Sequence, residues 1–287
     1  MTDPIRFDEQ VAVVTGAGRG LGAAYARLLA ERGAAVMVHD AGVDLSGLGS
    51  DRSVADAVVA EIHAAGGEAT ACYEDLTADG ACQRAVDLAL DRYGRLDVLI
   101  NNAGLLGHAP IEEVGPELFS RMVRVSVEAP FLLSQAAFPE MKRRRYGRIV
   151  VTTSGRAMYI NAALQGLTAY AVGRGAQIGL MVSLAAEGDP FGVRVNAVSP
   201  VATTRMTMSE DAPPMAPEQV APGVAFLASA ACDFSGVILR AAGGRFSVAR
   251  YEFSSGVNFG VEVIAPEAIA ERWAEIAGKP GAATGIL

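Results

Sequence analysis

The sequence predicts a single doubly wound α/β domain built on a parallel sheet of about seven strands. Short apolar runs rich in valine and isoleucine alternate along the chain with longer alanine-rich stretches of helical period, which is typical of βαβ units. No internal repeat or low-complexity tract interrupts this alternation. The chain has 287 residues, of which 51% are hydrophobic, so one large core can be buried.

The apolar runs that we expect to form strands are 11–15, 35–39, 68–73, 98–101, 148–153, 194–198 and 237–241. Stretches of helical period lie at 20–32, 54–65, 80–93, 117–144, 169–187 and 217–230, and they are expected to make right-handed crossovers between the strands. Residues 1–244 therefore form the main domain. We expect residues 245–287 to contain a helix over 266–277 and to pack on the same domain or on a neighbouring subunit.

Composition and charge exclude several classes of protein. The net charge of −8 and the pI of about 5.0 exclude nucleic acid as a partner, because phosphate binding needs clustered positive charge. No apolar run reaches the ~20 residues that a membrane helix requires, and the first ten residues lack the apolar core of a signal peptide. We therefore expect a cytoplasmic protein that binds no membrane. The three cysteines and three histidines lack metal-ligand spacing, which predicts free thiols and no metal site.

A glycine-rich loop follows the first predicted strand and leads directly into the first predicted helix. Thr15–Gly22 reads T-G-x-x-x-G-x-G, whereas G-x-G-x-x-G spacing from Gly16 would need glycine at Leu21. Glycines let backbone amides approach a pyrophosphate, and the helix N-terminus supplies partial positive charge. A tight turn that binds nothing would not need four glycines here, so the loop predicts a Rossmann-type dinucleotide site. Its candidate binding residues are Thr15, Gly16, Gly18, Arg19, Gly20, Leu21 and Gly22.

The end of the second predicted strand indicates which nucleotide binds. Asp40 follows that strand, and an acidic side chain there accepts hydrogen bonds from the adenosine ribose hydroxyls and repels a 2′-phosphate. This favours NAD over NADP, although Arg19 in the loop would favour the phosphate. After the third strand, Asp75 and Leu76 are candidates for contacting the adenine. A helix N-cap is the alternative role for Asp75.

Three motifs together resemble the short-chain dehydrogenase/reductase family: Thr15–Gly22, Asn101-Asn102-Ala103-Gly104 and Tyr170-x-x-x-Arg174. A closer likeness is to the (3R)-hydroxyacyl-CoA dehydrogenase modules of type 2 peroxisomal multifunctional enzymes and their bacterial single-domain relatives. It runs through 3–8, 39–62, 146–150, 196–207 and 259–276. The resemblance implies NAD(P)-dependent oxidoreduction of a secondary alcohol or ketone in a homodimer or homotetramer. The substrate that it implies is hydrophobic, such as an acyl-CoA thioester or a steroid-like alcohol.

Tyr170 and Arg174 are the centre of the predicted active site. Residues i and i+4 of a helix share a face, so both side chains should enter one cleft. A phenol titrates near ~10 in water, so a nearby cation such as Arg174 is needed to favour the phenolate. Tyr170 would then exchange a proton with the alcohol; a tyrosine packed in a subunit interface is the alternative. Ser154, at the end of the fifth predicted strand, matches the family's serine that bonds the reacting oxygen, with Thr153 and Thr152 as alternatives if the strand end is shifted.

Two positions depart from the family pattern. Ser126 stands where the family has a helical asparagine, and Arg174 stands where it has lysine. Arginine can bond ribose hydroxyls and carry positive charge beside Tyr170, but it does not readily lose a proton, which closes any relay through an ammonium. The chain contains 22 arginines and two lysines, Lys142 and Lys279, and neither lysine is placed to compensate. An NAD(P)-binding protein without turnover, acting as a partner subunit or regulator, is therefore the alternative to an enzyme.

The remaining cofactor candidates are Asn102, Ala103, Gly104, Pro200, Val201 and Thr203. The first three close the fourth predicted strand and are expected to shape the cleft through side-chain-to-backbone hydrogen bonds. The last three follow the sixth strand and are expected to meet the nicotinamide carboxamide.

Residues 204–217 form a mobile substrate lid or a plain surface loop. His108 contacts substrate or faces solvent. The basic run 142–145 favours stabilisation of a helix C-terminus over binding of a CoA phosphate.

Overall fold

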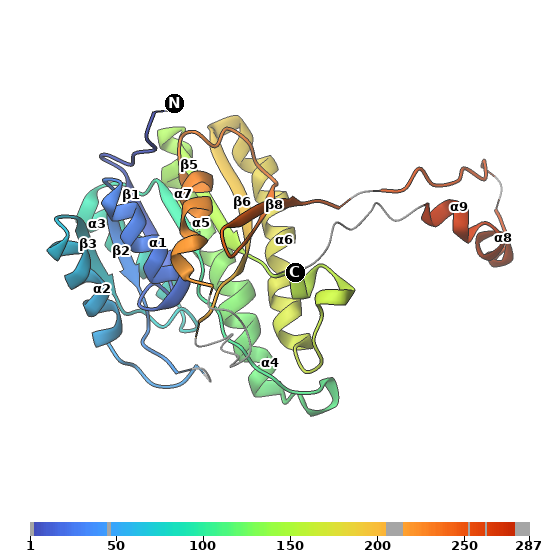
Figure 1. Ribbon diagram of the computed structural model, residues 1–287, viewed down its shortest axis with the longest axis horizontal. Coiled ribbons are helices and arrows are strands. Elements are labelled where there is room, and N and C mark those ends of the chain that lie inside the picture. Colours follow the sequence, from blue (N-terminus) through green and yellow to red (C-terminus); the bar gives the residue numbers. More distant parts are fainter. Residues whose placement is uncertain (1–2, 45–46, 205–214, 252, 262, 279–287) are drawn as a thin grey trace. The chain divides into compact units, whose positions relative to one another are not determined.

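The computed structural model describes residues 3–44, 47–204, 215–251, 253–261 and 263–278. The chain divides into two compact units, Met1–Val248 and Ala249–Leu287. The domain boundary expected after Gly244 stays a prediction. The first unit contains the sheet and helices α1 to α7 (Figure 1).

An eight-stranded sheet with the order β3-β2-β1-β4-β5-β6-β7-β8 forms the centre of the first unit. The strands are β1 (Val11–Thr15), β2 (Ala35–His39), β3 (Glu68–Cys72), β4 (Val98–Asn101), β5 (Gly147–Thr152), β6 (Val193–Val201), β7 (Ile238–Ala242) and β8 (Arg245–Ala249). Neighbouring strands from β3 to β7 are parallel, and the strand order reverses beside β1, as in a doubly wound sheet. The predicted doubly wound α/β fold is confirmed.

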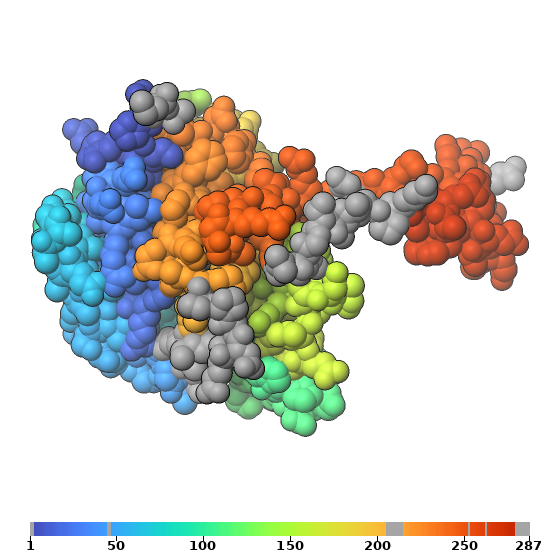
Figure 2. All heavy atoms as spheres, viewed as in Figure 1, coloured from blue at the N-terminus to red at the C-terminus, as the bar shows by residue number. Residues whose placement is uncertain are grey.

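Strand β8 is an addition to the predicted elements. It is joined to β7 by Gly243 and Gly244, which both have positive φ (51° and 78°). A two-residue connection joins antiparallel neighbours, so β8 makes the sheet mixed. Residues 245–248 are exposed and lie on the face drawn in Figure 2. An exposed strand at a sheet edge alternates polar and apolar residues and contains no apolar run, which is why the sequence pattern did not predict it.

Helices cover both faces of the sheet. They are α1 (Gly20–Glu31), α2 (Ser53–Ala64), α3 (Ala81–Tyr93), α4 (Pro116–Val123), α5 (Ala129–Arg144), α6 (Thr168–Gly188) and α7 (Ala221–Ala228). Short turns are η1 (Ile111–Glu113), η2 (Arg124–Glu128), η3 (Gly155–Ala157), η4 (Ile160–Ala162), η5 (Asp189–Phe191) and η6 (Pro217–Gln219). Helices α1, α2 and α7 pack on one face, and α3, α5 and α6 pack on the other.

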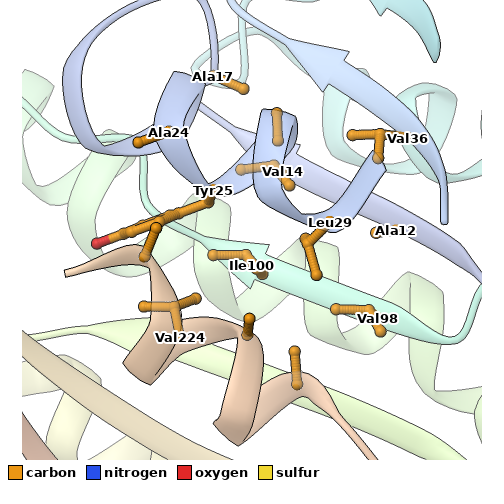
Figure 3. Close-up of a cluster of buried hydrophobic side chains, with 14 of the residues drawn as sticks. Ala12, Val14, Ala17, Ala24, Tyr25, Leu29, Val36, Val98, Ile100 and Val224 are labelled. Atoms are coloured by element: carbon orange, nitrogen blue, oxygen red, sulfur yellow. The ribbon is translucent and has the colours of Figure 1, made fainter. Parts of the chain in front are cut away.

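A cluster of buried side chains fills the space between the sheet and helices α1, α2 and α7. Figure 3 shows the part of it contributed by Ala12, Val14, Tyr25, Leu29, Val98, Ile100 and Val224. Successive strand residues point to opposite faces, so alternate residues of β1 and β4 enter this cluster. Val13 and Leu99 point to the other face and are also fully buried. Burial on both faces explains why these strands read as continuous apolar runs.

The predicted continuous helix over 117–144 is wrong. The structure divides this stretch into α4, the π-helical turn η2 and α5. Pro130 has no backbone N–H, so the Ser126 carbonyl lacks its donor from residue i+4. Gln177 of α6 supplies one instead, because its Nε2 donates to that carbonyl at 3.1 Å. The proline is therefore the local reason for an irregular turn at this point.

The second unit contains α8 (Pro266–Glu271) and α9 (Trp273–Ala277). The predicted helix over 266–277 is thus interrupted at Arg272, which pairs with Glu275. The packing of this segment on the same domain or on a neighbouring subunit stays a prediction. Within the described parts of the chain, no helix is both long and apolar enough to cross a membrane.

Candidate cofactor and active site

The loop between β1 and α1 is packed so tightly that its glycines have no room for side chains. Gly16 and Gly20 have positive φ, 62° and 53°, which favours glycine. A Cβ on Gly22 would lie 2.1 Å from the Gly16 carbonyl oxygen, and a Cβ on Gly18 would lie 2.4 Å from Val54. Helix α1 begins here without a side-chain cap, so its first N–H groups have no intrahelical partners. Phosphate binding requires this arrangement.

The Thr15 hydroxyl joins the ends of β1 and β4. It donates to the Ile100 carbonyl (3.3 Å) and accepts from the backbone N–H groups of Asn102 and Ala103 (both 3.0 Å). Asn102 Nδ2 donates in turn to the carbonyls of Thr15 (2.9 Å) and Gly16 (3.2 Å). Asn102 therefore makes side-chain-to-backbone bonds of the expected kind, and they hold the end of β4 against the phosphate loop.

Asp40 lies just beyond β2 and is 8% exposed. Its Oδ2 accepts from the Gly18 N–H (2.9 Å), and its Oδ1 accepts from the Gly42 N–H (2.8 Å). A carboxylate has about four acceptor sites, so capacity is left for ribose hydroxyls. Arg19 is exposed, and its Nη1 donates to the Val43 carbonyl (3.4 Å). The two residues predicted to decide between NAD and NADP thus contact the same short loop.

Asp75 and Leu76 follow β3. Asp75 Oδ1 accepts from the Thr77 N–H (3.0 Å) and from the Thr77 hydroxyl (2.8 Å), as in an Asx turn. The next helix begins at Ala81 with Gly80 at its N-cap, so the alternative of a helix N-cap for Asp75 is wrong. Leu76 is buried. The adenine contact expected of both residues stays a prediction.

The Arg174 side chain is buried in α6 and is held on two sides. Its Nη1 donates to the Thr152 carbonyl at the end of β5 (2.9 Å), and its Nη2 lies 2.0 Å from the position that a Cβ on Gly104 would take. Its Cζ lies 5.4 Å from the centre of the Tyr170 ring, within the range of a cation–π contact. The i, i+4 spacing predicted this meeting of Tyr170 and Arg174 on one face of α6.

Ser154 follows β5, which ends at Thr152. Its hydroxyl oxygen accepts from the Arg156 N–H (3.3 Å), so the hydroxyl hydrogen is left for donation to a substrate oxygen. Thr153 is fully buried and donates its hydroxyl to the Arg174 carbonyl (2.8 Å), and the Thr152 hydroxyl is also buried. Of the three candidates, Ser154 alone has a partly exposed side chain, and the geometry favours it.

Ser126 is buried in the turn η2. A Cβ on Gly173 would lie 2.6 Å from the Ser126 Cβ, so η2 packs closely against α6. The residue that the sequence reasoning missed here is Gln177, which caps the Ser126 carbonyl. Its position three residues after Arg174, on the same face of α6, was the available signal.

The predicted nicotinamide contacts Pro200 and Val201 lie inside β6, opposite Ala241 and Ala242 of β7. The prediction that they follow the strand is wrong, because pairing with β7 extends β6 by three residues beyond Val198. They still stand at the carboxyl end of a parallel strand, where ligands bind in open α/β sheets.

The base of the predicted lid is closed by two hydrogen bonds. The Thr203 N–H donates to the Met215 carbonyl (2.7 Å), and the Met215 N–H donates to the Thr203 hydroxyl (2.9 Å). A Cβ on Gly20 would lie 3.3 Å from Thr204 Cγ2, so this base lies beside the phosphate loop. Most of the predicted lid, 205–214, lies outside the described residues.

His108 joins the loop after β4 to the long loop after β5. A Cβ on Gly166 would lie 2.5 Å from His108 Cε1, and the Ala109 N–H donates to the Gly166 carbonyl (2.9 Å). His108 is exposed.

The basic run 142–145 contacts Glu140, the Phe191 ring and the carbonyls of Gly94 and Pro190. These contacts tie the end of α5 to its neighbours and support its role at a helix C-terminus.

The three cysteines, Cys72, Cys82 and Cys232, are buried free thiols. Burial raises the pKa of each thiol, that of Cys82 to about 11. In the described ranges, no three His, Cys, Asp or Glu side chains are grouped so that they could hold a metal ion.

The residues at this edge of the sheet fit a dinucleotide. Gly18 and Gly22 have no room for side chains in the loop that leads into α1, and the Asp40 carboxylate accepts from the Gly18 N–H beside that loop. Three polar atoms at the other end are buried without a hydrogen-bond partner among the described residues: Arg174 Nε, Thr152 Oγ1 and Ser199 Oγ. Buried polar atoms normally have partners, and the hydroxyl and amide groups of a ribosyl nicotinamide could supply them.

Comparison with known proteins agrees with this geometry. Residues 10–214 match the family model described as short chain dehydrogenase. The chain is 38% identical over 282 residues to peroxisomal multifunctional enzyme type 2 of Mus musculus, and the alignment covers 96% of this chain and 38% of that protein. The chain spans between 31% and 40% of the length of this and two other multifunctional relatives.

Two solved structures are similar over most of the chain. A short chain dehydrogenase from Mycobacterium avium is 34% identical, with a TM-score of 0.82 and coverage of 96% of both chains. A 7α-hydroxysteroid dehydrogenase complexed with NADH and 7-oxo glycochenodeoxycholic acid is 31% identical, with a TM-score of 0.74 and coverage of 83% of this chain and 95% of that one. Because the family match takes in the glycine-rich loop, helix α6 and six of the strands, this chain belongs to the short-chain dehydrogenase family of oxidoreductases.

Proposed function

We propose that this chain is an NAD-preferring oxidoreductase that interconverts a secondary alcohol and a ketone on a hydrophobic substrate, such as a 3-hydroxyacyl-CoA-like or steroid-like molecule. One observation carries the proposal: the phosphate loop and Tyr170 are built onto the same edge of the sheet. Thr15 joins the end of β1 to that of β4, and Arg174 joins the end of β5 to the helix that bears Tyr170. This edge is where open α/β sheets bind their ligands.

The chain's own residues would handle the proton, while a bound NAD would supply the hydride acceptor. Tyr170 takes the alcohol proton at its phenolic oxygen, and Ser154 donates its hydroxyl hydrogen to the reacting oxygen. The guanidinium of Arg174 lies 5.4 Å from the centre of the Tyr170 ring and places a positive charge beside it. Arginine keeps its proton, so the proton taken up by Tyr170 leaves by a path that does not pass through Arg174.

The proposed activity is tested by mixing the purified chain with NAD and a panel of hydrophobic secondary alcohols and following NADH absorbance. Tyr170→Phe should abolish turnover and leave the affinity for NAD nearly unchanged. Tyr93→Phe, which changes a tyrosine of α3, is the matched control and should keep activity. Arg174→Lys should maintain or raise the rate if the guanidinium substitutes for an ammonium. Turnover that survives Tyr170→Phe would remove the tyrosine from its proposed role.

The alternative function is a nucleotide-binding partner subunit or regulator without turnover. The observation that favours it is the anchoring of Arg174, which is 4% exposed and bonded to the Thr152 carbonyl. Saturable NAD binding by calorimetry, with no NADH formed from any alcohol of the panel, would support this alternative.

The preference for NAD rests on Asp40. Its carboxylate lies beside the phosphate loop, and a negative charge there repels a 2′-phosphate. Asp40→Ala should weaken NAD binding and raise the ratio of NADP affinity to NAD affinity, both measured by calorimetry. An unchanged ratio would contradict the role of Asp40.

The assembly is proposed to be a cytoplasmic homodimer or homotetramer. Apolar side chains on the outer face of α5 and α6 support an assembly: Phe131, Leu132 and Val182 are 52%, 42% and 58% exposed. They lie along helices that also border a groove of about 470 Å³. Sedimentation equilibrium should show a dimer or tetramer, and Val182→Glu should shift it towards the monomer. A monomeric wild-type chain would overturn this part of the proposal.

A further inference from the structure

Arg240 of β7 reaches the residue that follows Ser154. Its Nη1 lies 3.2 Å from the position that a Cβ on Gly155 would take. Gly155 is the first residue of η3, directly after the proposed catalytic serine, and it is buried. Side chains of the long loop, Tyr159 and Ala162, lie 3.9 Å from the same position. The guanidinium therefore occupies a space bordered by the loop that carries Ser154.

The strand order shows what the Arg240 side chain must cross. Strand β6 lies between β7 and β5, and neighbouring strands are about 4.8 Å apart. To approach Gly155 after β5, the side chain of Arg240 has to extend across β6. Its register partner on β6 is Ser199, whose Oγ is buried and has no hydrogen-bond partner in the described ranges. The guanidinium therefore lies at the carboxyl edge of the sheet, next to the proposed nicotinamide contacts Pro200 and Val201.

Two loops at this edge of the sheet lack acidic side chains. Residues 102–111, after β4, and 153–167, after β5, contain no aspartate or glutamate. The second of these loops also carries Arg156, the residue directly after Gly155. Arg240 and Arg156 therefore both bring positive charge to the loop that follows Ser154, and positive charge attracts an anion.

We propose that Arg240 binds an anionic group of the substrate, a carboxylate or a phosphate, and so determines substrate class. A guanidinium presents a planar fork that pairs with either group through two parallel hydrogen bonds. This inference rests on the proposed function and narrows the class of substrate. The alcohol carries a negative charge on the part of the molecule that lies near Gly155. Arg240 takes no part in moving the proton or the hydride.

The test compares three substrates that differ in charge: a long-chain 3-hydroxy fatty acid, its neutral methyl ester and its CoA thioester. Arg240→Gln should raise the KM for the acid at least tenfold, change kcat by less than twofold, and leave the ester unaffected. Arg240→Lys, which keeps the charge without the fork, should give an intermediate KM. If a CoA phosphate is the group bound, the KM rises for the thioester instead of the acid. Arg245→Gln, an exposed arginine of β8, is the matched control and should leave every KM unchanged.

Equilibrium binding separates this inference from the proposed function. In the Tyr170→Phe variant saturated with NADH, calorimetry should show that a charged ligand binds at least tenfold more tightly than the ester. This difference in affinity should disappear in the double variant that also carries Arg240→Gln. If the wild-type chain shows the same preference for the charged ligand but no turnover, the inference about Arg240 is supported although the proposed function fails. Equal affinity for all three ligands, no binding of any of them, or an equal loss for all three on Arg240→Gln would overturn the inference.

Discussion

The guanidinium of Arg174 occupies the space that a side chain on residue 104 would need. A Cβ on Gly104 would lie 2.0 Å from Nη2 and 2.9 Å from Cζ. The guanidinium has little freedom to withdraw, because Arg174 is 4% exposed and its Nη1 is bonded to the Thr152 carbonyl. The glycine after β4 and the arginine that replaces the family's lysine therefore form one packing unit.

Gly104→Ala should displace the guanidinium and break its bond to Thr152. We expect a loss of stability of about 1–3 kcal/mol from overpacking and at least a tenfold fall in kcat/KM. Lysine ends in a smaller group than arginine, so Arg174→Lys should relieve the clash, and the double variant should lose less than the sum of the single losses. Urea unfolding and NADH formation measure both effects.

Gly175→Ala is the matched control, since a Cβ on this glycine of α6 would meet no atom within 4 Å. It should be neutral or slightly stabilising, because alanine favours the helix. Additive losses in the double variant would show that Gly104 and Arg174 do not share one space.

A second prediction concerns two buried threonines at strand ends. Thr15→Val removes the oxygen that accepts from the Asn102 and Ala103 N–H groups and leaves two partly buried donors unpaired, at a cost of about 1–3 kcal/mol in total. Thr152→Val removes a buried hydroxyl that has no partner within the described residues and should change stability by less than about 0.5 kcal/mol. The free energy of unfolding in urea distinguishes the two. Equal losses would contradict the role of the Thr15 hydroxyl.

The strands could be predicted because a strand that is buried on both faces of the sheet consists of consecutive apolar residues. The bounds of β1, β2 and β4 agree with the prediction, and all their residues but Ala35 are buried. Two features were missed. β8 is an exposed edge strand without an apolar run, and η2 forms where Pro130, a signal present in the local sequence, breaks the hydrogen-bond ladder.

The site could be predicted to the extent that its residues are close in sequence. The i, i+4 spacing gave the meeting of Tyr170 and Arg174, and the glycine pattern gave the loop. What could not be predicted is contact between elements that are distant in sequence. The approach of Arg240 from β7 to Gly155 depends on strand order, which local spacing does not encode. The spacing from Arg174 gives the face of α6 on which Gln177 lies, but the Ser126 carbonyl that it caps depends on helix packing.

Gln177 and Pro130 provide a third prediction. Gln177→Leu should leave the Ser126 carbonyl without a donor, at a cost of about 1–3 kcal/mol in the free energy of unfolding. Pro130→Ala restores a backbone N–H that can donate to that carbonyl, so the double variant should recover part of the loss. A double variant as unstable as Gln177→Leu alone would show that the carbonyl is not the reason for the cost.

The thiols provide a fourth prediction. All three are buried, and burial raises the pKa of each, so few thiolates form at pH 8. A disulfide reagent should therefore modify the folded chain slowly and should titrate three thiols quickly once the chain is unfolded in urea. Rapid modification of the folded chain would contradict the burial.

The last prediction is the pH dependence that His39 gives to stability. Burial lowers the pKa of its imidazole, and Nε2 lies 2.8 Å from the Glu74 carbonyl. In the unfolded chain a histidine titrates near ~6.5, so below that pH the unfolded state binds a proton that the folded state does not. The contribution of His39 is present above about pH 6.5 and falls with decreasing pH, by at most ~1.4 kcal/mol per unit. Urea unfolding at pH 7.5 and 5.5 should show a smaller slope in His39→Asn, whereas His108→Asn, at an exposed position, should keep it. An identical slope in His39→Asn and the wild-type chain would mean that His39 accepts a proton as easily when folded as when unfolded.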